Sequence, residues 1–166
     1  MFYAGIGSRE TPTGVLAEMR GIAKELKELG YTLRSGGALG ADTAFASADA
    51  KAQIYLPWAG YNKVRRSTLN EPTPPAIELA KTFHPAWHRC GEGAKKMHGR
   101  NMHILLGPNL DTPVDFVVCW TKDGRDTGGT GQAMRVAVTY GTPVFNLYHF
   151  DALPELRDFI SRGNTL

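Results

Sequence analysis

Short apolar runs alternate with longer amphipathic segments along the chain, and this alternation is typical of β-strands that alternate with α-helices. Five apolar runs have the length of strands and lie at residues 2–6, 31–34, 53–56, 114–120 and 143–147. The run at 114–120 has the strongest β-propensity, so we expect it to be an interior strand that helices cover on both faces.

The segments between these runs carry apolar residues at every third or fourth position, which is the pattern of one buried helix face. The clearest example spans residues 13–29 and ends at Gly30, a residue type that readily ends a helix. We expect further helices at 43–51, 75–82, 93–106, 132–140 and 153–160. No internal repeat or flexible linker divides the sequence, so we predict one α/β domain over residues 1–166, with a mostly parallel sheet between helices.

The composition is that of an ordinary domain with a core, except for its glycine content. Hydrophobic residues make up 42% of the 166 residues, and the chain contains 19 glycines, whereas average usage would give roughly 12. No apolar run reaches the ~18 residues of a membrane span, and the chain opens directly into a strand rather than a signal segment. We therefore expect a cytoplasmic protein that does not contact a membrane.

The extra glycines concentrate where three of the predicted strands end. Three glycine-rich segments, at residues 7–9, 35–40 and 124–131, come after strand runs. Ser35 and Thr130 add hydroxyl groups to the second and third of these segments. Parallel α/β sheets bind ligands beyond the carboxyl ends of their strands, where glycines let backbone N–H groups approach an anion and helix N-termini add positive potential. This layout predicts a phosphate-binding site at one edge of the sheet.

Two common classes of nucleotide-binding enzyme do not fit the sequence. The chain has no Gly-x-x-x-x-Gly-Lys-Ser/Thr motif, which argues against an ATPase. Its second strand run ends in Arg34-Ser35 rather than in an acidic residue, which argues against an NAD-dependent dehydrogenase. The net charge of +3 does not by itself identify a nucleic-acid-binding protein, although basic residues cluster at 63–66 and 95–100.

The cysteines and histidines give no metal-ligand pattern, and we predict neither a metal site nor a cofactor. Cys90 and Cys119 have no Cys-x-x-Cys partner and no histidine at ligand spacing, so we expect two reduced thiols. His84, His88 and His103 are spread through the middle of the chain without carboxylate partners.

Four segments together resemble a known superfamily: Gly5–Arg9, Ser35–Asp42, Arg100-Asn101 and Gly128–Ala133. They are similar to the Rossmann-like superfamily (SLOG) that unites the DNA-processing proteins DprA/Smf with the LONELY GUY (LOG) nucleotide hydrolases. The stretch Ser-Gly-Gly-Ala-x-Gly-x-Asp at 35–42 resembles the DprA signature. The compact length is similar to that of stand-alone DprA-like proteins of phages and prophages. The resemblance implies a Rossmann-like three-layer domain with a mostly parallel central sheet flanked by helices.

The DprA branch implies a role in DNA processing and recombination. DprA-like proteins bind single-stranded DNA and help load a recombinase onto it. By this resemblance, the contacts to backbone phosphates would be made by Arg9, Ser35, Gly37, Arg100 and Asn101. Members of the superfamily often self-associate, so the resemblance also implies a homo-oligomer.

The LOG branch implies an enzyme that cleaves the N-glycosidic bond of a nucleoside monophosphate. Its arginine lies in a Met-His-x-Arg motif, which Met97–Arg100 matches, and its glutamate follows a Pro-Gly-Gly-x-Gly-Thr turn. Residues 132–135 of this chain contain no glutamate. Because the oxocarbenium-like transition state needs a carboxylate, Asp42, Asp123 or Asp126 would have to replace it.

Our leading hypothesis is the binding of a phosphorylated nucleotide or of single-stranded nucleic acid at the sheet edge. One alternative is a LOG-like nucleotide N-glycosidase with Arg100 and Asp42 as catalytic residues, and another is a non-catalytic protein that binds a nucleotide signal. Trp58 follows the strand run at 53–56, Trp120 ends the run at 114–120, and both are candidates for stacking on a base. The predicted ligand-binding residues are Gly7, Ser8, Arg9, Ser35, Gly36, Gly37, Ala38, Gly40, Trp58, Asn101, Trp120, Gly128, Gly129, Thr130, Gly131 and Gln132.

Overall fold

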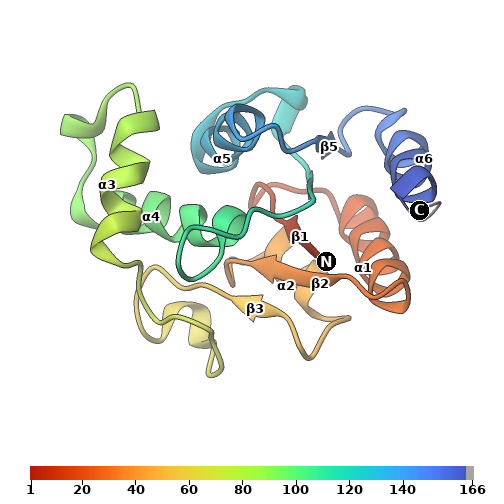
Figure 1. The fold of residues 1–166 in the computed structure, drawn as a ribbon, viewed down its shortest axis with the longest axis horizontal. Helices are drawn as coiled ribbons and strands as arrows, with labels where there is room; N and C mark the ends of the chain where they lie inside the picture. Colours follow the sequence, from red (N-terminus) through yellow and green to blue (C-terminus); the bar gives the residue numbers. More distant parts are fainter. Residues whose placement is uncertain (164–166) are drawn as a thin grey trace.

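The computed structural model describes residues 1–163, and its elements follow the predicted alternation of strands and helices (Figure 1). The strands form one five-stranded sheet in the order β3-β2-β1-β4-β5, and every neighbouring pair is parallel. Their bounds are β1 (Phe2–Gly5), β2 (Thr32–Ser35), β3 (Gln53–Ile54), β4 (Phe116–Cys119) and β5 (Val144–Asn146). The predicted parallel sheet is confirmed.

In the described part of the chain, six α-helices and three short 3-10 helices connect and flank these strands. The α-helices are α1 (Thr13–Glu28), α2 (Ala41–Ala46), α3 (Pro74–Phe83), α4 (Glu92–Leu106), α5 (Gly128–Thr139) and α6 (Ala152–Gly163). The 3-10 helices are η1 (Tyr61–Lys63), η2 (Trp87–Arg89) and η3 (Lys122–Gly124). Within residues 1–163, every helix is too short or too polar to traverse a lipid bilayer.

The helices cover the sheet on both faces and give a three-layer Rossmann-like fold (Figure 1). Alternate residues of a strand point to opposite faces, so Tyr3 and Phe116 pack under α1, α2 and α6. Ala4 and Val117 pack on the other face under α4 and α5, and α3 packs against α4. All four residues of β4 are buried, which confirms the prediction of an interior strand covered on both sides.

The largest differences from the predicted helix bounds occur in α2 and α5, and both have identifiable reasons. The helix expected at 43–51 ends at Ala46, because the carboxylate of Asp49 accepts the backbone N–H groups of Lys51 (2.9 Å) and Leu33 (3.3 Å) and holds the chain in turns. The helix expected to begin at Gln132 begins at Gly128. The last four residues of the third glycine-rich segment, Gly128–Gly131, therefore form the first turn of α5 rather than a separate turn before it.

The strand order places an opening between the ends of β1 and β4. The chain leaves β1 toward α1 on one face of the sheet and leaves β4 toward α5 on the other face. Such a divergence of neighbouring connections creates a crevice outside the carboxyl ends of the two strands, where open α/β sheets bind their ligands. The fold alone thus points to the β1–β4 junction as the site.

Candidate functional site

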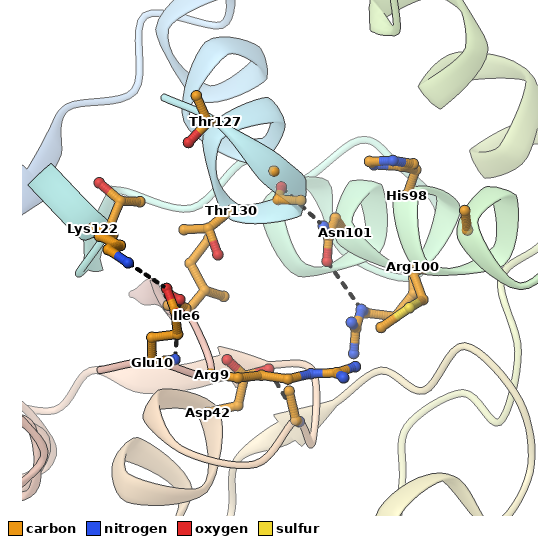
Figure 2. A pocket seen from close by; sticks show the side chains of 18 residues that line it. Ile6, Arg9, Glu10, Asp42, His98, Arg100, Asn101, Lys122, Thr127 and Thr130 are labelled. Atoms are coloured by element: carbon orange, nitrogen blue, oxygen red, sulfur yellow. Dashed lines mark hydrogen bonds and ion pairs between the residues drawn. The ribbon is translucent and has the colours of Figure 1, made fainter. Parts of the chain in front are cut away.

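A cavity of about 550 Å³ lies at the β1–β4 junction (Figure 2). Its walls come from the loop after β1, the start of α2, one side of α4, the loop after β4 and the first turn of α5. The lining residues are Ile6, Gly7, Ser8, Arg9, Glu10, Ala38, Asp42, Ala94, Met97, His98, Arg100, Asn101, Thr121, Lys122, Thr127, Gly128, Gly129 and Thr130.

The loop after β1 carries Arg9 into this cavity. The backbone N–H of Ser8 donates to the carbonyl of Trp120 at 3.1 Å, which joins the loop to the end of β4. The Ser8 hydroxyl accepts the N–H of Glu10 at 3.1 Å and closes a tight turn. Arg9 projects from this turn, and its guanidinium lies 3.4 Å from the hydroxyl of Tyr61.

Arg100 enters the cavity from α4 and is buried, with 4% of its surface exposed. Its Nη1 donates to the carbonyl oxygen of Gly36 and its Nε donates to Oδ1 of Asn101 at 2.9 Å. The amide of Asn101 in turn donates to the carbonyl of Gly129 at 3.4 Å. Asn101 therefore links the guanidinium of α4 to the first turn of α5.

Arg9 and Arg100 lie beside each other in the cavity. Figure 2 shows the side chain of Arg9 extending toward the guanidinium of Arg100. Tyr61 contacts both groups, since its hydroxyl is near Arg9 and its ring lies 5.7 Å below the guanidinium carbon of Arg100. Two adjacent guanidinium groups repel each other, and an anion bound between them would remove that repulsion.

The first turn of α5 faces these cations across the cavity. Thr127, Gly128, Gly129 and Thr130 line the wall, and Thr127 caps the helix without a side-chain hydrogen bond. The first N–H groups of a helix have no partners within the helix and carry the positive end of its dipole. This turn is thus suited to a phosphate group.

Asp42 lies in the floor of the cavity and is 4% exposed. Its Oδ2 accepts the backbone N–H groups of Gly36 at 3.1 Å and Ala38 at 3.3 Å. The pKa of Asp42 is raised, because the effect of burial exceeds the opposing effects of the Arg100 charge and of the backbone hydrogen bonds from Ala38, Gly36 and Gly7. The carboxylate therefore holds together the loops that follow β1 and β2.

His98 lines the cavity from α4 as a neutral ring. Burial and the positive charges of His84, Arg100 and Arg135 lower its pKa to about 4. At neutral pH it offers a ring face and hydrogen-bonding nitrogens, and it adds no charge.

The structure brings ten of the predicted site residues into the cavity wall: Gly7, Ser8, Arg9, Ala38, Asp42, Arg100, Asn101, Gly128, Gly129 and Thr130. It places the other eight elsewhere: Ser35, Gly36, Gly37, Gly40, Trp58, Trp120, Gly131 and Gln132. The wall also contains residues that the sequence reasoning missed, notably Glu10, His98, Lys122 and Thr127.

The second glycine-rich segment supports the floor of the cavity through Ser35, Gly36 and Ala38. The N–H groups of Gly36 and Ala38 already donate to Asp42, and the hydroxyl of Ser35 donates to the carbonyl of Gly5 at 2.6 Å. A Cβ on Gly36 would overlap Nη1 of Arg100. Glycine is needed here because two buried charged side chains approach the backbone.

The two tryptophans do not line the cavity. Trp120 is 7% exposed and packs in the core beside Tyr148, with ring centroids 6.4 Å apart. Trp58 is 39% exposed and stands edge-on to Tyr61 at 5.2 Å. Trp120 is therefore a core residue rather than a base-stacking platform, because its ring is enclosed by apolar neighbours.

Gln132 and Gly131 contribute to the packing of α5. Gln132 is 1% exposed, and neither polar atom of its amide has a hydrogen-bond partner among the described residues. Gly131 packs directly against the backbone of Asp126, where a Cβ would overlap the carbonyl group.

One group of three residues within the described chain has a donor set that suits a metal ion, and it consists of His84, Cys90 and His98. Sequence spacing did not identify it. The described residues form no other cluster of three or more histidine, cysteine and acidic side chains at ligand distance.

Comparison with solved structures identifies a similar fold. The chain resembles DNA processing protein A from Helicobacter pylori. The two structures superpose with a TM-score of 0.59 and 19% sequence identity, over 95% of this chain and 72% of the other. The H. pylori protein is described as having a unique single-stranded DNA binding mode. No protein-family model and no curated protein sequence matches the chain.

At this level of identity the comparison with DNA processing protein A establishes the shared fold. It agrees with the resemblance inferred from the Ser35–Asp42 stretch. The structure explains why that stretch is distinctive, since its first residue, its glycines and its aspartate join β1, α2 and α4 at the floor of the cavity.

Proposed function

We propose that this protein binds single-stranded nucleic acid and holds a backbone phosphate in the cavity between β1 and β4. The observation that carries the proposal is the pairing of Arg9 and Arg100 opposite the first turn of α5. The fold shared with DNA processing protein A, which is described as binding single-stranded DNA, supports the same ligand.

The charges around the cavity favour an anion. Arg9, Arg100 and Lys122 contribute three positive charges, and Glu10 and Asp42 contribute two negative ones. Glu10 lies 3.8 Å from Lys122, but both side chains are about two-thirds exposed, at 66% and 67%. An ion pair this exposed is weak, so a phosphate can compete for Lys122.

The position of Asp42 favours binding over glycosidic cleavage. A catalytic carboxylate must face the sugar or an attacking water, whereas the carboxylate of Asp42 already accepts N–H groups from Gly36 and Ala38. We therefore assign Asp42 to positioning the two loops and Arg100. A phosphate contact, by contrast, needs only Arg9, Arg100 and the free N–H groups of α5.

The size of the cavity favours a second candidate, the binding of a free nucleotide. A volume of about 550 Å³ lies within the range of about 300–1,000 Å³ that is typical of small-molecule sites. A LOG-like reaction in this cavity would have to use Arg100 and Asp42, and a nucleotide-signal binder would use the same walls without turnover.

The test of single-strand binding is the fluorescence anisotropy of a labelled oligothymidylate titrated with the protein. We expect Arg9→Ala to weaken binding about five- to tenfold, as for the loss of one charged phosphate contact. Arg20→Ala removes the same charge from the exposed face of α1 and should stay within about twofold of the wild type. Equal affinities of the two variants would contradict the proposed site.

A panel of nucleoside monophosphates distinguishes the second candidate. Release of free base, detected by chromatography and lost in Arg100→Ala, would establish the glycosidase. A rise in melting temperature with a nucleotide, without oligonucleotide binding or base release, would instead establish a nucleotide-binding protein.

The resemblance to DprA-like proteins also leads us to propose self-association and a recombinase partner. Light scattering coupled to size-exclusion chromatography tests the first. Pull-down of a purified recombinase, with and without single-stranded DNA, tests the second.

A further inference from the structure

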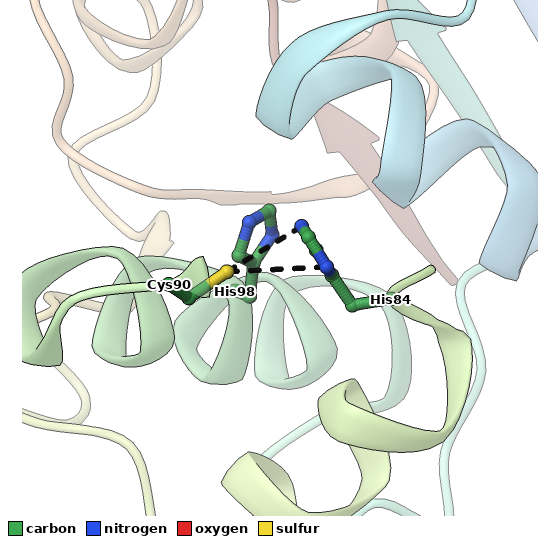
Figure 3. Close-up of side chains that lie close together, drawn as sticks. All are labelled: His84, Cys90 and His98. Carbon is green, nitrogen blue, oxygen red and sulfur yellow. Dashed lines mark hydrogen bonds between the residues drawn. The ribbon is translucent and has the colours of Figure 1, made fainter. Parts of the chain in front are cut away.

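His84, Cys90 and His98 meet where the connection between α3 and α4 folds back onto α4 (Figure 3). His84 ends α3, Cys90 ends η2 and His98 lies in the second turn of α4. One possible ligand atom from each residue lies within 4.8 Å of the other two. Side chains separated by six and eight positions in the sequence are thus gathered at one point by the packing of the connection.

The spacing of the donor atoms is close to that of a tetrahedral zinc site. Zinc bonds of about 2.3 Å to sulfur and about 2.0–2.1 Å to nitrogen, at tetrahedral angles, place sulfur and nitrogen about 3.6 Å apart. Sγ of Cys90 lies 3.6 Å from Nε2 of His84. The two ligand atoms that lie farthest apart are within 4.8 Å of each other. They would have to approach by about 1 Å to reach tetrahedral spacing, and rotation of the side chains can supply this movement.

The donor types select a transition metal. A thiolate and two imidazoles are ligands of zinc and related ions, whereas magnesium and calcium require oxygen ligands. Nδ1 of His98 is buried and has no hydrogen-bond partner among residues 1–163. A buried ring nitrogen without a partner is uncommon in a folded protein and is open to a ligand.

We propose that His84, Cys90 and His98 form a binding site for zinc or a similar divalent transition metal. Three protein ligands leave the fourth tetrahedral position to water or to an atom of a bound molecule. His98 also lines the main cavity, so the ion lies at its rim and fastens the connection between α3 and α4 beside it.

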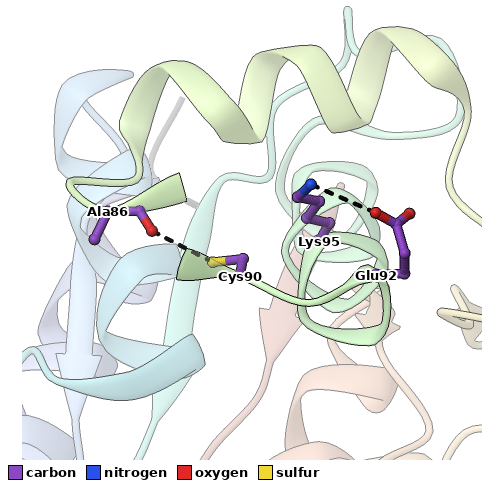
Figure 4. Close-up of polar contacts among 4 residues, drawn as sticks. All are labelled: Ala86, Cys90, Glu92 and Lys95. Atoms are coloured by element: carbon purple, nitrogen blue, oxygen red, sulfur yellow. Dashed lines mark hydrogen bonds and ion pairs between the residues drawn. The ribbon is translucent and has the colours of Figure 1, made fainter. Parts of the chain in front are cut away.

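The contacts of His84 and Cys90 determine how many protons are released when an ion binds. The N–H of Ala86 donates to Nδ1 of His84 at 3.1 Å, which places the ring proton on Nε2, the nitrogen nearer to Cys90. Besides its contacts of 3.6 Å and 3.9 Å to Nε2 and Nδ1 of His84, the thiol of Cys90 makes a long contact of 3.9 Å to the carbonyl of Ala86 (Figure 4). When the ion binds Nε2 and Sγ, the His84 proton moves to Nδ1, the Ala86 contact opens, and the thiol proton passes to solvent.

The surroundings fit a site that carries one thiolate. Trp87 packs beside both histidines and shields one side of the cluster. The centroid of its ring lies 6.0 Å from that of His84 and 6.4 Å from that of His98. The positive charges of Arg100 and Arg135 reach the ring of His98. The thiolate of Cys90 offsets part of their repulsion toward the ion.

The test is a titration of the metal-stripped full chain with cobalt(II), followed by displacement with zinc. We expect one equivalent to produce the thiolate-to-cobalt charge-transfer band and the visible bands of a tetrahedral ion, with one proton released per ion to a pH-indicator dye. Zinc at 100 times its dissociation constant should raise the melting temperature by about 5–10 °C.

Matched variants test whether Cys90 and His84 are ligands. Cys90→Ser should abolish the charge-transfer band and lower zinc affinity at least about 100-fold, and His84→Ala should also weaken binding. His88→Ala removes an exposed histidine of the same connection and should bind like the wild type. The proposal is overturned if the folded wild type gives no thiolate band, or if Cys90→Ser and His88→Ala bind zinc equally.

Discussion

The glycines at the start of α5 allow a comparison of two identical substitutions two residues apart. A Cβ on Gly131 would overlap the carbonyl group of Asp126 and lie 2.8 Å from its Cα. A Cβ on Gly129 would meet only Nδ2 of Asn101, at an ordinary 3.9 Å. The same added methyl group is thus blocked by backbone at one position and tolerated at the other.

The expected effects on stability have opposite signs. Replacing a helical glycine by alanine stabilises a helix by about 0.5–1 kcal/mol, so Gly129→Ala should raise the free energy of unfolding by up to that amount. For Gly131→Ala the same gain is outweighed by overpacking, which costs about 1–3 kcal/mol. The net loss of up to about 2.5 kcal/mol should lower the melting temperature by up to roughly 10 °C.

Thermal and urea denaturation of both variants measure this difference. Gly131→Ala should also weaken oligonucleotide binding, because the displaced first turn of α5 no longer presents its N–H groups to the cavity. If Gly131→Ala is as stable as Gly129→Ala, the packing of α5 against Asp126 described above is wrong.

Two further predictions concern buried polar groups. Asp42→Ala should lower the free energy of unfolding by about 3–5 kcal/mol in urea denaturation, because it leaves Arg100 without its buried counter-charge and the N–H groups of Gly36 and Ala38 without an acceptor. Asp42→Asn keeps an acceptor oxygen and should lower the free energy of unfolding by less. A similar loss in both variants would contradict this account. The pKa of His98 is about 4 in the folded chain, against an ordinary value of 6.5. Between pH 6.5 and about pH 4, the unfolded chain therefore binds a proton at His98 that the folded chain does not bind. The free energy of unfolding should fall as the pH falls through this window. With a metal chelator present, His98→Asn should lose less stability than the wild type between about pH 7 and about pH 5; parallel losses would show that His98 is not the responsible group.

The sequence predicted the layers of the fold because each face of the sheet has its own periodic signal. The alternation of Tyr3 with Ala4 and of Phe116 with Val117 matches two separate cores. Helix ends were less predictable, since they depend on single side chains. The predicted helix at 43–51 stops early because the carboxylate of Asp49 accepts two backbone N–H groups, those of Leu33 and Lys51. The apolar periodicity of the sequence does not indicate these contacts.

The edge of the sheet where the cavity lies follows from the sequence pattern, but the surroundings of its glycines do not. The carboxyl ends of parallel strands share one edge, and the cavity lies at that edge, between β1 and β4. Gly36 and Gly131 were predicted to approach a ligand, whereas they approach Arg100 and Asp126 of the protein itself. Sequence cannot distinguish a glycine that makes room for a ligand from one that makes room for another part of the protein, because in both cases a Cβ would not fit.

The missed residues fall into two groups. Lys122 lies in the loop after the strand run at 114–120, so the same edge argument could have found it. The cluster of His84, Cys90 and His98 could not have been found in this way, because it depends on how the connection between α3 and α4 folds back onto α4.

The salt dependence of single-stranded DNA binding tests the central claim most directly. Each phosphate contact on a single strand contributes about −0.7 to the slope of log K against log salt concentration. We expect a steep negative slope for the wild type, an equal slope for Arg20→Ala, and a slope that is shallower by about 0.7 for Arg9→Ala. A slope for Arg9→Ala that equals that of the wild type would contradict a phosphate held in the cavity between β1 and β4.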